Sequence, residues 1–148
     1  MRVLAVDPGV ATGMAEWRND EFRSWQLDDP EDVLESVWDF CEEFYADPDV
    51  DVELVVEDFR IAGARGKTEA GIRATIELIG AIKFIASWHA VPVRMQTPAD
   101  AKTFSTNDKL RRAGFETPSK PDHRRSAARH LLLRLVRTGA IDGTDLIR

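Results

Sequence analysis

Four side chains stand at positions where they could do chemistry. Asp7 ends the apolar run 2–6, Glu57 ends the apolar run 52–56, and Asp122 and His123 stand at the start of the last helical pattern. An ionised carboxylate at the end of a buried strand is costly unless it is paired, hydrogen-bonded or bound to a metal. Carboxylate oxygens suit Mg²⁺ or Mn²⁺, and two such ions can activate a water and stabilise the leaving oxygen of a phosphodiester. These residues therefore predict a metal-dependent hydrolytic site.

Each of these residues also has an ordinary structural interpretation. Asp7 precedes Pro-Gly and could open a turn. Glu57 could be a surface residue, with Asp58 as the ligand in its place. Asp122 could serve only as the N-cap of the last helix, where unpaired N–H groups favour a carboxylate, and His123 could be an exposed helix residue. All of these ordinary interpretations are less probable together than any one of them alone, because the predicted order of strands and helices brings the acids to one edge of the sheet.

Five runs of residues have the composition of strands. The run 2–6 is apolar and β-branched, as in a central strand. The runs 12–17 and 22–27 flank Asn19-Asp20, whose turn chemistry predicts a hairpin. The runs 52–56 and 91–95 each follow a helical stretch, and right-handed crossovers would set both parallel to the first strand. The ends of the first and fourth strands, with Asp7 and Glu57, would then converge at one edge of the sheet.

Helical patterns separate and follow these strands. The first helix starts with Asp29 as N-cap and Pro30 at its first position. The stretch 67–89 is apolar nearly all round, which predicts a helix buried on more than one side. Thr97 caps a short helix over 98–103, 105–120 is typical of a helix turn plus a mobile loop, and the last helix covers 121–138 with Gly139 as its stop. The fold class is α/β: a five-stranded mixed sheet, β-β-β-α-β-α-β-α, with helices on both faces.

Length and cysteine content narrow the class of protein. The 148 residues fit one domain over 1–148, large enough to bury a core. Cys41 is the single cysteine, which excludes a disulfide framework and a cysteine-based zinc site and fits a reducing interior. The N-terminus has no signal-peptide pattern, and no apolar run reaches the length of about 18 residues that a membrane span needs. We therefore expect a cytoplasmic protein with no membrane partner.

Charge is distributed unevenly along the chain. The net charge is −6, but residues 1–60 carry 4 Lys/Arg against 18 Asp/Glu, whereas residues 101–148 carry 11 against 5. The basic C-terminal third could contact a phosphate backbone, and the alternative is a solvated helical surface. The residues that could contact phosphates are Arg111, Arg112, Arg124, Arg125 and Arg129.

Four segments carry a family resemblance. V-D-P-G-V-A-T-G-M-A at 6–15 resembles the first motif of RuvC-like Holliday junction resolvases, ribonuclease-H-like enzymes whose first strand ends in Asp-Pro-Gly before a Thr-Gly pair. V-V-E-D-F-R at 55–60 is similar to the strand-end Glu of the family, with an aromatic residue shortly after it. The stretch 70–82 resembles the helix that these enzymes use in dimerisation, and P-A-D-A-K at 98–102 resembles a further segment with a lysine.

The resemblance implies roles for particular residues. Asp7 and Glu57 would be the first two ligands of two Mg²⁺ or Mn²⁺ ions. Lys102 and Lys109 would contact or assist the scissile phosphate. Phe59 would insert at the centre of the junction, although it follows the glutamate more closely than is usual in the family.

The last motif departs from the family pattern, which is Asp-x-x-Asp or His-x-x-Asp at the head of the final helix. One alignment places His123 and Ser126 at these two positions, and the other places Asp122 and Arg125 there. One usual carboxylate is missing in either alignment. We expect Asp122 to complete the site, with His123 as a ligand or proton-transfer group.

The resemblance implies a Mg-dependent endodeoxyribonuclease of the crossover junction type, from a phage or another prokaryotic source. A homodimer would nick branched DNA, a four-way junction, at two sites, with binding that falls steeply as salt rises. One alternative is another ribonuclease-H-like nuclease, acting on RNA:DNA hybrids or in packaging. The other is a catalytically inactive module that binds branched DNA. Half of an actin-like ATPase also starts with an Asp-Gly-Thr loop, but 148 residues cannot supply its two lobes.

Overall fold

The computed structural model of the chain describes residues 1–46, 50–59, 68–115 and 122–146. These residues contain a five-stranded sheet in the order β3-β2-β1-β4-β5. Its strands are β1 (Arg2–Asp7), β2 (Thr12–Arg18), β3 (Glu21–Leu27), β4 (Val52–Glu57) and β5 (Val93–Gln96). β1, β2 and β3 pair antiparallel, whereas β4 runs parallel to both β1 and β5. The mixed sheet predicted from right-handed crossovers is confirmed.

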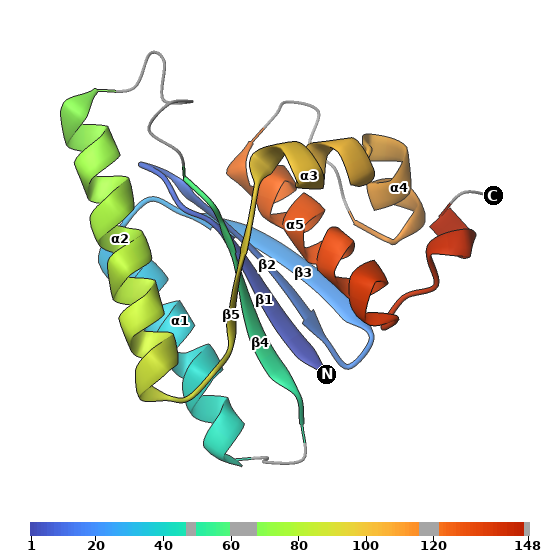
Figure 1. Cartoon of the computed structure of the whole chain (residues 1–148), viewed down its shortest axis with the longest axis horizontal. Helices are drawn as coiled ribbons and strands as arrows, with labels where there is room; N and C mark the ends of the chain where they lie inside the picture. The colour runs from blue at the N-terminus through green and yellow to red at the C-terminus, as the bar shows by residue number, and fades with distance from the viewer. Residues whose placement is uncertain (47–49, 60–67, 116–121, 147–148) are drawn as a thin grey trace.

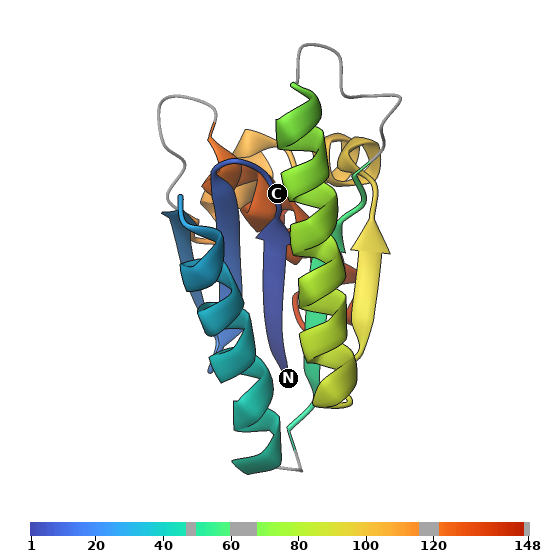
Figure 2. The same ribbon diagram turned by 90° about the vertical axis from the view of Figure 1, so that its left-hand side faces the viewer.

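Helices cover both faces of the sheet, as predicted. The helices are α1 (Pro30–Ala46), α2 (Glu69–Trp88), α3 (Pro98–Phe104), α4 (Asn107–Arg112) and α5 (His123–Thr138), followed by the 3₁₀ helix η2 (Gly143–Leu146), which the sequence did not predict. α1 and α2 lie on one face, and α3, α4 and α5 lie on the other (Figure 1). The view from the side shows α1 and α2 next to each other in front of the strands (Figure 2). None of the helices in the described ranges combines the length and apolarity needed to span a bilayer.

Local signals in the sequence explain where the elements begin and end. Asn19 and Asp20 have φ of 52° and 61°, the left-handed pair that a two-residue hairpin turn requires. The Asp29 carboxylate accepts a hydrogen bond from the Glu31 N–H (2.8 Å) at the start of α1. Threonine side chains accept from the first turns of α2, α3 and α4. Gly139 ends α5 in the left-handed conformation.

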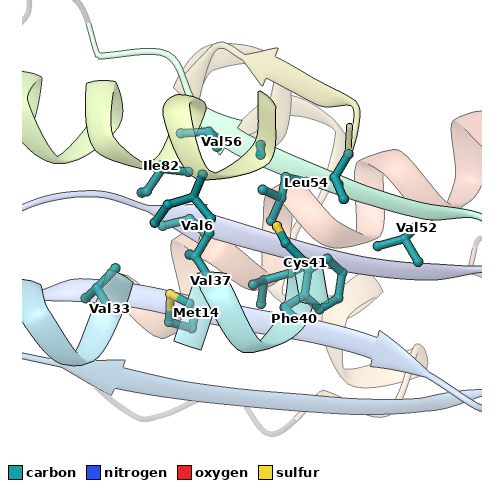
Figure 3. Packing of buried hydrophobic residues seen from close by; sticks show 14 of the residues in the cluster. Val6, Met14, Val33, Val37, Phe40, Cys41, Val52, Leu54, Val56 and Ile82 are labelled. Carbon is teal, nitrogen blue, oxygen red and sulfur yellow. The ribbon is translucent and has the colours of Figure 1, made fainter. Parts of the chain in front are cut away.

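Strand alternation divides the core into two layers. Leu4 and Val6 of β1 point toward α1 and α2, as do Met14 of β2 and Leu54 of β4, and they pack in one cluster with Ile82 of α2. Figure 3 shows this layer with several of these side chains labelled. Side chains of the opposite parity pack against α5, among them Val3, Ala5, Ala15 and Val55. Because successive side chains of a strand alternate, the parity of residues 3 and 5 directs Asp7 toward α5, and the parity of Val55 directs Glu57 the same way.

α2 differs from its prediction. Leu78, Ile82 and Ile85 of this helix are buried. Phe84 and Trp88, however, are 65% and 66% exposed in the single chain. The prediction of a helix buried on more than one side is therefore wrong for the isolated chain, because the buried residues of α2 form a single stripe and the side turned away from the strands is exposed (Figure 2).

Candidate active site

Four residues form a row across one edge of the sheet. Gly13 of β2 pairs with Asp7 of β1, and Glu57 of β4 pairs with Gln96 of β5. The register of β1 on β4 pairs Val6 with Val56, which places Asp7 beside Glu57. Gly13, Asp7, Glu57 and Gln96, called the sheet-edge row below, thus lie on four neighbouring strands. The predicted convergence of Asp7 and Glu57 at one edge follows from this register.

α5 lies over the sheet-edge row and bonds to both carboxylates. Nδ1 of His123 is 2.8 Å from Oδ2 of Asp7. The Ser126 hydroxyl donates to Oε2 of Glu57 (3.0 Å), and Nε2 of His130 lies 2.9 Å from the same oxygen. Spacings of three and four residues bring these three side chains to one face of the helix. Side chains of the single helix α5 therefore fix the positions of both carboxylates, those of Asp7 and Glu57.

The start of α5 touches β2 so closely that only glycine fits at residue 13. A Cβ on Gly13 would lie 2.0 Å from the carbonyl oxygen of His123 and 2.7 Å from the amide nitrogen of Arg124. The neighbouring Thr12 closes the turn after β1 by donating its hydroxyl to the carbonyl of Gly9 (3.3 Å). The Thr-Gly pair thus shapes the turn next to Asp7 and sets the distance between α5 and the sheet.

Asp122 bonds within its own helix. It is the N-cap of α5 and accepts from the Arg125 N–H (3.0 Å), while its other carboxylate oxygen accepts from Nε of Arg124 (2.7 Å). Of the two alignments of the last motif, the one that pairs His123 with Ser126 supplies the side chains that contact Asp7 and Glu57. The role of Asp122 as a metal ligand stays a prediction.

Burial and charge shift the protonation of Asp7, which is only 6% exposed. Burial raises the pKa of its carboxyl above the ordinary value, the hydrogen bond from His123 opposes this rise, and the charge of Glu57 adds to it. A bound cation would relieve both the desolvation and the repulsion.

The donor set at this edge fits a hard divalent ion, because it consists of carboxylate oxygens, with the imidazoles of His123 and His130 beside them. Asp7 contacts His123, whereas Glu57 contacts Ser126 and His130. Within the ranges that the structure describes, no three His, Cys, Asp or Glu side chains are grouped as a metal centre. Asp7 and Glu57, which β1 and β4 place side by side, are the residues at this edge whose oxygens suit such an ion, and His123 contacts Asp7 beside them.

Comparisons with solved structures show which known fold this chain resembles. No protein-family model and no curated protein matches the sequence. Among solved structures, T. thermophilus RuvC in complex with a Holliday junction substrate matches with a TM-score of 0.64 and 16% identity over 94% of this chain and 96% of that one. Thermus thermophilus RuvC by itself matches with a TM-score of 0.56 and 15% identity over 94% and 97%. The chain has a RuvC-like fold.

The basic residues predicted to bind DNA lie on the same side of this RuvC-like fold as α5. Lys102 is exposed on α3, and the Lys109 ammonium on α4 lies 4.2 Å from the centre of the Phe104 ring. Arg111 pairs with Asp108. The other predicted residues are Arg112 on α4, which is exposed, and Arg124, Arg125 and Arg129 on α5, which are half-buried.

Two further residues frame Glu57 at the end of β4. The Asp58 N–H donates to the carbonyl of Gln96 (2.7 Å), which continues the pairing of β4 with β5. Phe59 follows and is half-buried, next to residues 60–67, which lie outside the described ranges. Whether Phe59 inserts into a junction is not tested by this position and stays a prediction.

Two residues of the site were missed by the sequence reasoning. Gln96 ends a parallel strand with a polar side chain, the same signal that identified Asp7 and Glu57. His130 follows His123 by seven residues, which is two helical turns. The strand-end signal and this spacing could have identified both.

Proposed function

We propose that the chain is a metal-dependent, structure-specific endonuclease that resolves four-way or other branched DNA by paired phosphodiester hydrolysis. The observation that carries the proposal is the convergence of Asp7 and Glu57 at the ends of adjacent parallel strands, with His123 over them. The fold similarity to a RuvC that binds a Holliday junction substrate supports the choice of DNA substrate.

Each side chain of the site would have its own role toward the metal ions or the phosphate. Two Mg²⁺ or Mn²⁺ ions, when bound, would supply water activation and charge stabilisation at the phosphate. Asp7 and Glu57 would hold them through carboxylate oxygens, and Ser126 would restrain Glu57. The His123 side chain is 42% exposed, so its ring can reach a substrate as a ligand or as a proton-transfer group.

Basic side chains beside the site would bind the phosphate backbone. Lys102 and Lys109 would lie next to the scissile phosphate, and the contact of Lys109 with the Phe104 ring restrains its flexible side chain. Arg111, Arg112, Arg124 and Arg125 would extend this contact along α4 and the first turn of α5. Backbone contacts of this kind give affinity without sequence preference.

A homodimer would bring two such sites to one junction. Ile76, Phe84 and Trp88 lie eight and four residues apart, so they follow one face of α2. Ile76 is 47% exposed, and Phe84 and Trp88 are more exposed still. Several large apolar side chains exposed together on one helix face are typical of an interface. We propose that the same face of a second copy covers them.

One observation favours a second candidate function. The carboxylates of Asp7 and Glu57 bond to different side chains of α5. Ser126 stands where RuvC-like resolvases, which the sequence resembles, commonly have an acid. A site with one acid fewer would fit a catalytically inactive module that still binds branched DNA.

Cleavage of a labelled synthetic four-way junction with Mg²⁺ tests the proposal. We expect symmetric nicks from the intact protein and none from Asp7→Asn. Asp122→Asn is the matched variant, because asparagine also caps a helix while it removes the charge. Lost cleavage in Asp122→Asn would support Asp122 as a ligand, and unchanged cleavage would rule that role out.

The same assay separates the alternatives. Junction binding without cleavage by the intact protein would refute the nuclease and favour the inactive module. Faster cleavage of an RNA:DNA hybrid than of the junction would instead indicate a different ribonuclease-H-like nuclease.

A further inference from the structure

His130 is a fully buried imidazole with both ring nitrogens in hydrogen bonds. Its exposed fraction is 0%, and it stands on α5 between the buried apolar residues Ala127 and Leu131. Nε2 lies 2.9 Å from Oε2 of Glu57, and Nδ1 lies 3.1 Å from Oε1 of Gln96. A polar ring in such a layer is tolerated because both nitrogens are paired.

The contact with His130 restrains the orientation of the Glu57 carboxylate. The last torsion of a glutamate side chain is broad, so the plane of its carboxylate is poorly fixed without partners. Oε2 of Glu57 receives hydrogen bonds from Ser126 and His130, both on α5. Because a carboxylate only accepts, Nε2 of His130 carries the hydrogen in this contact.

Gln96 supports the ring from the other side. It is 5% exposed, and it belongs to the sheet-edge row as the pairing partner of Glu57. Its amide lies 3.1 Å from Nδ1; when Nε2 carries the ring hydrogen, Nδ1 accepts, and a half-turn of the amide brings its NH₂ group to Nδ1 in place of Oε1. This contact limits rotation of the imidazole. The side chains of Gln96, His130 and Glu57 thus form a continuous chain of contacts from β5 through α5 to β4.

We propose that His130 is a positioning residue that orients the Glu57 carboxylate to receive a divalent cation, with Gln96 holding the ring. The inference rests on the proposed function, because it takes Glu57 as a metal ligand. Residues that hydrogen-bond to a metal ligand typically change metal affinity or activity by about 10- to 100-fold when they are replaced. His130 would act through Glu57 without touching the substrate.

The test measures Mn²⁺ affinity of the whole chain without DNA, from the electron paramagnetic resonance signal of free Mn²⁺. We expect His130→Leu, which keeps an apolar side chain in the layer and removes the donor, to weaken Mn²⁺ binding by about 10- to 100-fold. His130→Gln keeps an N–H donor near the position of Nε2, and we expect it to recover most of the affinity. Junction binding in EDTA should be the same for all three proteins.

A matched control replaces another buried histidine. His89 is 4% exposed and ends α2 at the opposite end of the sheet, where its ring meets that of Trp38. His89→Leu makes the same substitution at another buried position, and we expect it to leave Mn²⁺ affinity unchanged. A loss in both leucine variants would show that any buried histidine has this effect and would overturn the specific role of His130.

The outcomes separate the inference from the proposed function. Wild-type Mn²⁺ affinity in a folded His130→Leu, or no recovery in His130→Gln, overturns the positioning role. If His130→Leu does not fold, Gln96→Met takes its place, and unchanged affinity there overturns the inference. If the intact protein binds Mn²⁺ but cuts no junction, the nuclease proposal fails while His130 is still judged by Mn²⁺ affinity. If the intact protein binds no Mn²⁺, both fail.

Discussion

Gly13→Ala adds one methyl group at the point where α5 meets the sheet, and we expect it to inactivate the site. Gly13 pairs with Asp7 across β1 and β2. The new Cβ would lie 2.0 Å from the carbonyl oxygen and 2.1 Å from the carbonyl carbon of His123. Both atoms belong to the backbone, so no side-chain rotation can relieve the overlap, and α5 must move away from β2.

The size of the movement follows from these distances. Opening a 2.0 Å contact to the roughly 3.5 Å of ordinary contact moves the start of α5 by about 1 Å or more. Overpacking of this kind costs about 1–3 kcal/mol of stability. A displacement of about 1 Å at a catalytic group can cost about 100-fold in rate. The movement would also lengthen the 2.8 Å contact between His123 and Asp7.

Thermal unfolding and junction cleavage measure the two effects separately. Gly80→Ala is the matched control for thermal unfolding only: a Cβ at Gly80 of α2 meets nothing within 4 Å in the single chain, so alanine there should stabilise the helix by about 0.5–1 kcal/mol, but Gly80 lies on the face of α2 that we propose a second copy covers. We expect Gly13→Ala to unfold at a lower temperature and to cut at least about 100-fold more slowly in the temperature range where it is folded. Wild-type stability and cleavage in Gly13→Ala would refute the argument that this glycine sets the position of α5.

Two other predictions concern Asp7 and α2. Burial raises the pKa of Asp7, so ionising it destabilises the fold as pH rises from its ordinary pKa of 3.8 to the raised value. Asp7→Asn should therefore unfold at a higher temperature than the wild type at pH 7, with the difference vanishing below pH 3.8; a less stable variant at pH 7 would contradict this. Trp88→Glu should weaken self-association by at least about 30-fold in sedimentation equilibrium, since a buried interface tryptophan is commonly worth about 2 kcal/mol or more. Unchanged association would exclude this face of α2 from the dimer.

Features with local signals could be predicted from the sequence. The hairpin at Asn19-Asp20, the caps of α1, α3 and α5 and the ends of β1 and β4 each depend on residues that are neighbours in the chain. The parallel order of β1, β4 and β5 followed from the handedness of crossovers, which holds across folds. The sequence predicts Asp7 and Glu57 as site residues because each of them ends a strand and because the crossover rule places the ends of those two strands side by side.

Features that depend on contacts between distant residues could not be predicted in this way. His130 and Glu57 are 73 residues apart, and their contact depends on how α5 is placed along the sheet. On α2, an apolar pattern shows which residues avoid water but not what covers them. Phe84 and Trp88 therefore have the same sequence signal as the buried Ile82.

The choice between the two alignments of the last motif depends on the rotation of α5. Leu131 and Leu135 are fully buried against the sheet, and so is Ala127, which stands four residues after His123 and four before Leu131. His123 therefore lies at the margin of the stripe that faces the sheet. A shift of one residue along a helix turns the facing side by about 100°. If Asp122 took the place of His123 over Asp7, that rotation would carry Leu131 out of the core. Burial of the apolar face thus favours His123 over Asp7, and leaves Asp122 as the cap of the same helix.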